Sequence, residues 1–197
     1  MKIIGKTTSI NVRKVLWTCA ELDLPYDRED WNDTHASLNP NAMVPVLVDD
    51  GFVLWESNTI CRYLATKYAS GLLPENAQGR ARVEQWMDWQ ATELNTAWRY
   101  AFMALVRNSP AHQDPAQIEA GVAGWNRHIG ILDAQLARTG AYVTGEEFTL
   151  ADIVLGLSVN RWMMTPMARP EYPNVAAYYD LLNARPGFRE FGRNGVA

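Results

Sequence analysis

The stretch that decides the fold is Val44-Pro45-Val46-Leu47-Val48-Asp49-Asp50-Gly51-Phe52-Val53-Leu54-Trp55-Glu56-Ser57. Its two runs of β-forming residues, 46–48 and 52–54, are separated by Asp50-Gly51. This dipeptide favours a tight hairpin, because both central positions of such a turn need a positive φ. Ser57 stands where a helix N-cap is expected, ahead of apolar residues at helical spacing. The stretch therefore predicts a strand, a turn, a second strand and the start of a helix.

Two features of this stretch exceed the needs of a hairpin. Pro45 stands at the head of a strand, where it gives up a ladder donor. If its peptide bond is cis, Val44 turns its backbone N–H and C=O toward an extended peptide. Glu56-Ser57 places a carboxylate and a hydroxyl at a helix N-terminus, where free N–H groups favour an anion. Together these groups would hold an α-amino acid head group and a peptide backbone; an edge-strand proline and an ordinary N-cap are the alternative.

The segments around the hairpin predict a small α/β domain. Lys2 to Gly5 is an apolar run typical of a strand, and apolar residues at helical spacing predict a helix from about Asn11 to Leu22. Tyr26 to Trp31 predicts a second strand, parallel to the first through a βαβ crossover. Residues 32–43 form a polar loop, and the helix after the hairpin ends near Ala69. The expected order is β-α-β-loop-β-β-α.

Beyond the linker Ser70–Asn76 the strand signals stop. Arg80 to about Arg107 predicts a long helical stretch with a bend at Asn95-Thr96, and Pro115 to Thr139 a second long helix. Thr149 and Asp152 fit a capping box at the start of a third helix, and a last helix is expected over about 175–184. We therefore expect an α/β domain over 1–72 and an all-helical domain over 79–197.

The runs Asn39-Pro40-Asn41-Ala42-Met43-Val44-Pro45-Val46-Leu47 and Trp55-Glu56-Ser57-Asn58-Thr59-Ile60-Cys61-Arg62-Tyr63-Leu64 resemble the glutathione site of the glutathione S-transferase superfamily. The resemblance covers nearly the whole chain. It implies a thioredoxin-like N-terminal domain followed by an all-α C-terminal domain. It also implies that Val44, Pro45, Glu56 and Ser57 bind glutathione.

The segment Ser9-Ile10-Asn11-Val12-Arg13-Lys14-Val15 resembles the Ser-x-x-x-x-basic-Val pattern of the serine-type classes and the Thr-Pro-Asn pattern of the nu-like bacterial proteins. The resemblance implies that Ser9 stabilises the glutathione thiolate and that Asn11 is the nu-like asparagine. The chemistry fits, since the thiolate is the nucleophile and a hydroxyl donor at a helix N-terminus favours the charged form. Thr7 and Thr8 are rivals of Ser9, and a plain helix cap is the alternative role.

One position departs from the superfamily pattern. Many relatives carry a basic residue or Gln before the Val-Pro, where it helps to hold the glycyl carboxylate of glutathione. Met43 stands there in this chain. His35 or Asn41 would have to substitute, and an ordinary solvated histidine is the other reading of His35.

The resemblance places a second substrate between the domains. Trp98, Arg99, Phe102 and Met103 are the candidate wall residues, although an aromatic run on a helix is also typical of a core. The superfamily is commonly dimeric, so we expect a homodimer through Arg62 and the faces near residues 60–95. A solvated face is the alternative there.

Composition narrows the function classes. A net charge of −4 with scattered Lys and Arg argues against a nucleic-acid surface. No apolar run is long enough for a membrane span, and the first residues lack the apolar core of a secretory signal. Cys19 and Cys61 form no metal pattern and are expected to be buried and reduced. We therefore expect a cytoplasmic protein with no metal and no prosthetic group.

The expected activity is the conjugation of glutathione, as co-substrate, to a small, electrophilic, apolar compound. Two alternatives stay open. The Ser-x-Asn element also suits glutathione-dependent disulfide or peroxide reduction. Because Met43 cannot bind the glycyl carboxylate, a non-catalytic binding protein of the same fold is the second alternative.

Overall fold

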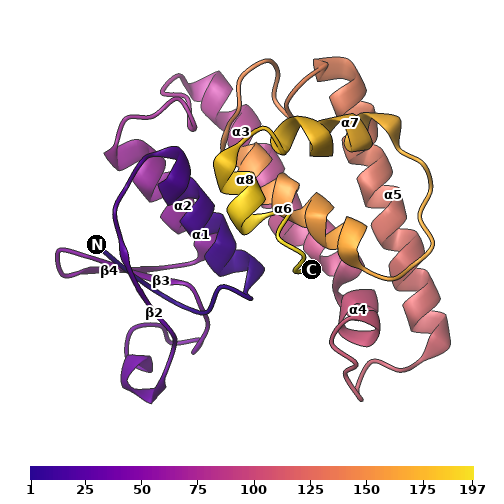
Figure 1. The fold of residues 1–197 in the computed structure, drawn as a ribbon, viewed down its shortest axis with the longest axis horizontal. Coiled ribbons are helices and arrows are strands. Elements are labelled where there is room, and N and C mark those ends of the chain that lie inside the picture. The colour runs from indigo at the N-terminus through magenta and orange to yellow at the C-terminus, as the bar shows by residue number, and fades with distance from the viewer.

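The computed structural model describes all 197 residues, and Figure 1 shows a small sheet with its helices beside a larger helical half. The sheet has the order β2-β1-β3-β4, in which β1 and β2 are parallel and the other pairs antiparallel. The strands are β1 (Lys2–Ile4), β2 (Asp27–Glu29), β3 (Val46–Asp49) and β4 (Phe52–Trp55). The helices of this half are α1 (Ile10–Glu21), η1 (Asp33–His35) and α2 (Ser57–Lys67). The element order agrees with the expected thioredoxin-like half.

The remaining chain is entirely helical. Its elements are α3 (Ala77–Trp89), η2 (Gln90–Leu94), α4 (Asn95–Leu105), α5 (Pro115–Thr139), α6 (Leu150–Met164), α7 (Pro173–Leu182) and α8 (Pro186–Phe191). A bend was predicted at Asn95-Thr96; the irregular segment of this stretch is η2, a π-helical turn directly before Asn95 that joins α3 to α4. None of these helices combines the length and the apolarity needed to cross a membrane.

Local sequence explains the hairpin and the start of α6. Asp50 and Gly51 both have positive φ, at 51° and 86°, as the turn between β3 and β4 requires. At α6 the buried carboxylate of Asp152 accepts from the N–H of Thr149 at 2.9 Å and from its hydroxyl at 3.1 Å. The same carboxylate accepts from the N–H of Val143 at 2.9 Å. The capping box therefore also fastens the preceding loop.

A continuous core joins the two halves. Helix α6 is buried from Leu150 to Trp162 and lies at its centre. Trp17 of α1 is fully buried and packs against Phe148 and Phe188, with ring centroids 5.7 and 5.1 Å away. A Cβ on Gly156 of α6 would lie 2.6 Å from Leu182 and 3.1 Å from the Trp17 ring, so the missing side chain lets α6 pack closely against α1. The orientation of α1 is thus fixed from the helical side.

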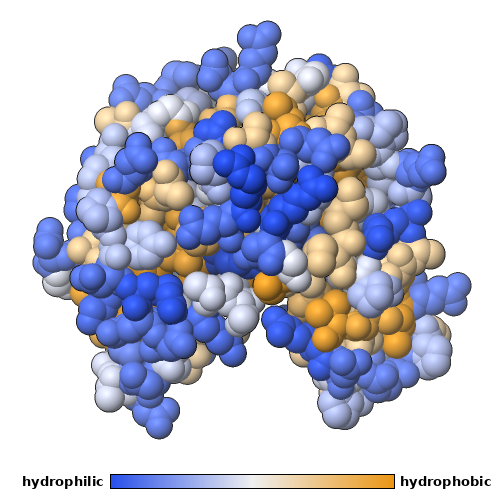
Figure 2. Space-filling model, in the orientation of Figure 1, coloured by the Kyte–Doolittle hydropathy of each residue, from blue (hydrophilic) through white to orange (hydrophobic).

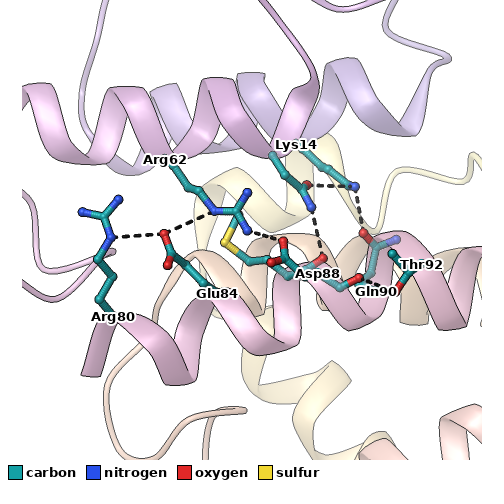
Figure 3. A network of polar contacts seen from close by, with 9 residues as sticks. Lys14, Arg62, Arg80, Glu84, Asp88, Gln90 and Thr92 are labelled. Carbon is teal, nitrogen blue, oxygen red and sulfur yellow. Dashed lines mark hydrogen bonds and ion pairs between the residues drawn. The ribbon is translucent and has the colours of Figure 1, made fainter. Parts of the chain in front are cut away.

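A polar network reinforces this contact (Figure 3). Lys14 of α1 is buried and donates to Asn58 of α2 at 3.2 Å and to Gln90 of η2 at 2.9 Å. Asn58 in turn donates to the carbonyl of Met87 at 3.1 Å. At the surface Arg62 pairs with Asp88 and Glu84. These contacts hold η2, and with it the start of α4, against the sheet half.

Candidate functional site

The head of β3 has the predicted geometry. The Val44–Pro45 peptide bond is cis, Pro45 is buried and Val44 is half-buried. Gly5, which follows β1, has a φ of 146°, and a Cβ there would meet Val12 at 2.5 Å and Val44 at 3.0 Å. Because Gly5 has no side chain, the loop that leads into α1 can approach Val44 closely.

The start of α2 corrects one prediction. Ser57 is the first helical residue, and the N-cap position belongs to Glu56, which has a φ of 73° and makes no side-chain cap. A non-glycine residue in this region is strained and points to a functional constraint. The side chains of Glu56 and Ser57 make no hydrogen bond within the protein, so both are free for a ligand at the helix N-terminus.

Two adjoining cavities form one cleft. The smaller, of about 330 Å³, is lined by Val44, Pro45, Glu56 and Ser57, with Asn39 and Asn41. The larger, of about 570 Å³, is lined by Ser9 and by residues of α4. Asn11, Met43 and Val44 line both cavities, so the two lie next to each other. Figure 2 shows the opening as a notch between the two halves, with apolar colouring on the α4 side.

Ser9 lies at the N-cap of α1, but its hydroxyl makes no cap hydrogen bond. A plain capping role is therefore not what this side chain performs. Asn11, two residues further along the chain, lines both cavities, and its side chain also makes no hydrogen bond within the protein. Of the two rivals, Thr8 lines the larger cavity and Thr7 does not.

The predicted wall residues all reach the larger cavity. Trp98, Arg99, Phe102 and Met103 line it from α4. Trp98 and Phe102 stack edge to face, with centroids 5.3 Å apart, and Phe102 is also part of the core. Phe102 therefore lines the cavity and belongs to the core at the same time.

Three basic residues in the same cavity were missed by sequence reasoning. They are Lys6, Arg107 and Arg161. The sequence did contain a signal for Arg161, because it is the one basic residue in the otherwise largely apolar helix α6. Burial and the neighbouring Arg13 and Arg107 lower the pKa of Arg161 to about 9.

His35 does not reach the cleft. It is buried; its Nε2 pairs with Glu29 at 2.6 Å, and its Nδ1 accepts from the N–H of Asn32 at 3.1 Å. The expectation that it substitutes for Met43 conflicts with this arrangement, because both ring nitrogens are engaged elsewhere. Met43 is 66% exposed at the rim. Asn41 lines the smaller cavity, and its side-chain amide is unbonded.

The cysteines lie away from the cleft. Both are free and buried, and burial raises the pKa of Cys19 to about 12 and that of Cys61 to about 11. Neither thiol is therefore ionised near neutral pH. The chain contains no group of three side chains placed to hold a metal ion.

Comparison with known proteins agrees with this geometry. Residues 8–67 match the model of the glutathione S-transferase N-terminal domain, and residues 115–181 that of the C-terminal domain. The chain is 36% identical to glutathione S-transferase GstB of Escherichia coli, over 94% of both chains. It is 31% identical to glutathione S-transferase 3 of Zea mays, over 96% of this chain and 92% of that one.

A solved structure has the same architecture along the whole chain. The theta class glutathione S-transferase from Xanthomonas axonopodis pv. citri, with glutathione bound, superimposes with a TM-score of 0.91 at 35% identity. The match covers 100% of this chain and 98% of that one. The chain belongs to the glutathione S-transferase family.

Proposed function

We propose that the cleft binds glutathione and adds its thiolate to a small electrophile. The tripeptide backbone lies along Val44, its γ-glutamyl end meets Glu56 and Ser57, and its sulfur lies beside Ser9. One observation carries this proposal. The side chains of Ser9, Asn11, Glu56 and Ser57 line two adjoining cavities, and none of them makes a hydrogen bond within the protein.

The proposed role of Ser9 requires only a small stabilisation of the glutathione thiolate. A free thiol with a pKa of about 8.5 is only a few per cent ionised at neutral pH. Lowering that pKa by two units requires about 2.7 kcal/mol. The Ser9 hydroxyl and the N-terminus of α1 would supply this stabilisation, since hydrogen bonds to a charged group contribute about 1.5–3 kcal/mol each. The sulfur then attacks the electrophilic carbon and the leaving group departs with the bonding electron pair.

The test is glutathione conjugation to chlorodinitrobenzene, measured by absorbance, for the wild type and Ser9→Ala. We expect kcat/KM to fall roughly 10- to 100-fold. The pKa of bound glutathione, titrated by thiolate absorbance, should rise toward that of free glutathione. Thr7→Ala is the matched control. An unchanged rate in Ser9→Ala with a loss in Thr8→Ala would move the role to Thr8.

A second activity is favoured by Asn11, whose free amide faces both parts of the cleft. It is glutathione-dependent reduction of disulfides or peroxides. Turnover of hydroxyethyl disulfide that is lost in Asn11→Ala would support it. Calorimetry without glutathione binding at millimolar concentration would leave only a non-catalytic binding protein.

We also propose a cytoplasmic homodimer. Glutathione as co-substrate and two free thiols suit a reducing compartment. Phe52, at the tip of the β3–β4 hairpin, is 48% exposed and stacks on Tyr63 of α2, close to the expected interface around Arg62. The mass in solution by light scattering tests the assembly.

A further inference from the structure

Arg161 is a buried cation without a partner. Its side chain is on α6 at the inner wall of the larger cavity, and the residue is only 4% exposed. The guanidinium makes no hydrogen bond within the protein, and its Nε is buried with no partner. Its carbon Cζ lies 4.2 Å from the ring centroid of Phe102 and 4.7 Å from that of Trp98. Aromatic faces stabilise a cation but leave its N–H donors unused.

The other buried cations show that this is unusual for the chain. Arg13 donates to the carbonyls of Phe191, Val196 and Ala197, at 3.1 to 3.3 Å. Lys14 donates to Asn58 and Gln90. A buried charge without such partners is costly, and this cost lowers the pKa of Arg161. Arg161 thus resembles Glu56 and Ser57, which also lack a hydrogen-bond partner and to which the proposed function assigns glutathione.

The cavity around Arg161 is basic as a whole. Lys6, Arg99, Arg107 and Arg161 line it, and its lining contains no Asp or Glu. The chain itself is acidic, with a net charge of −4, so the lining does not follow from composition. Arg107 lies 5.4 Å from the same Phe102 ring that Arg161 covers. The aromatic wall and the two guanidinium groups are therefore side by side.

We propose that the second substrate is an electrophile with an anionic group, a carboxylate foremost, that Arg161 and Arg107 bind. Its apolar body packs on Trp98, Phe102 and Met103. The inference rests on the proposed function and replaces the wholly apolar acceptor expected from the sequence. In the reaction the carbon–sulfur bond forms, the carbon–halogen bond of a halogenated acceptor breaks and the halide leaves with the electron pair. The carboxylate is unchanged.

The experiment compares two acceptors of equal shape and unequal charge, chlorodinitrobenzoate and chlorodinitrobenzamide. With the wild type we expect kcat/KM to favour the benzoate, corrected for the uncatalysed rates, by roughly 10-fold or more. Arg161→Gln should remove this preference and change the benzamide rate less than about 3-fold, while Arg161→Lys should retain part of it. Arg127→Gln, exposed on α5 and away from the cavity, is the matched control.

Because Arg161 is buried, each variant is checked by circular dichroism, and the exposed Arg107→Gln provides a second test that does not depend on core packing. Binding of unreactive dinitrobenzoate, by calorimetry, should weaken in both variants. Equal effects on both acceptors would overturn the inference. So would a rise only in KM for glutathione, since it would assign the guanidinium to the glycyl carboxylate. Absence of turnover with either acceptor would instead count against the proposed function.

Discussion

In the proposed complex, the glycyl carboxylate of glutathione would be bound without the basic residue or Gln that the superfamily pattern places before the Val-Pro. Met43 has no donor, and His35 is committed to Glu29 and Asn32. Asn39 is also committed, because it donates to the carbonyl of Met43 at 2.8 Å and accepts from the N–H of Asn41 at 2.9 Å. These contacts shape the loop and leave the Asn41 amide as a free donor at the smaller cavity, which the Asn11 amide also lines.

Asn41→Ala should therefore raise the KM for glutathione roughly 10-fold with little change in kcat, because it removes one hydrogen bond to a charged group. His35→Ala is the matched variant and should leave KM unchanged while lowering the midpoint of urea unfolding, since it breaks a buried contact. Steady-state kinetics with varied glutathione distinguish the two residues. A raised KM in His35→Ala with an unchanged KM in Asn41→Ala would instead assign the glycyl carboxylate to His35.

Residue types and spacing were enough to predict many of the side chains that line the cleft, but not its basic residues and not which side chains have a hydrogen-bond partner. Ser9, Val44 and Glu56 were found because short motifs mark them. The free guanidinium of Arg161 was not, since whether a buried cation has a partner depends on residues far away in the chain. The pairing of His35 with Glu29 was missed for the same reason.

At the scale of elements, local signals were accurate at some boundaries and not at others: α7 begins at Pro173, two residues before the predicted start, and α8 was not predicted. The helix predicted from Pro115 to Thr139 is α5 itself, because proline begins it and Gly140, with a φ of 79°, ends it. The start of α2 was off by one residue, since the positive φ of Glu56 has no local sequence cause. The π-helical turn of η2 was also missed, and it lies where Gln90 meets Lys14 from another helix.

The capping box of α6 has a pH-dependent consequence. Burial raises the pKa of Asp152 to about 6, although four hydrogen bonds to the carboxylate act in the opposite direction. An unfolded Asp has a pKa near 3.9, so between about pH 4 and 6 the folded state binds more protons. Stability from this group is fully present below pH 4 and is lost as the pH rises through 6, by on the order of 2–3 kcal/mol.

Asp152→Asn should abolish this pH dependence and cost about 1–3 kcal/mol at pH 7, because an amide has only one acceptor oxygen and its NH2 group would then face the N–H of either Thr149 or Val143. Urea unfolding at several pH values between 4 and 7 measures both effects. Asp180→Asn, on an exposed carboxylate paired with Arg193, is the control. A wild type and variant with parallel pH profiles would contradict the assignment.

For the molecule as a whole, the cleft exists because two halves are held at a fixed orientation. Lys14 is the buried charge at their junction, linking α1 and α2 to η2, and the residues that follow η2 form the cavity wall. The shape of the cleft thus depends on the contacts of Lys14, which does not line the cavity itself. A substitution of Lys14 therefore tests the junction without changing a residue of the cleft.

Burial lowers the pKa of Lys14 to about 8, well below that of an unfolded lysine. The unfolded state therefore binds more protons between about pH 8 and 10.4, and this group makes the protein more stable as the pH rises through that window, by on the order of 3 kcal/mol. Lys14→Met should abolish the rise. It should also lower kcat/KM at neutral pH, because Asn58 and Gln90 lose their donor and η2 is no longer tied to α1.

Urea unfolding at pH 7.5 and 10 measures the change of stability with pH, and Lys6→Met, on an exposed lysine, is the control for it. If the stability of wild type and Lys14→Met changes equally with pH, Lys14 is not the group that titrates. Another residue would then have to connect the junction between the halves to the cleft.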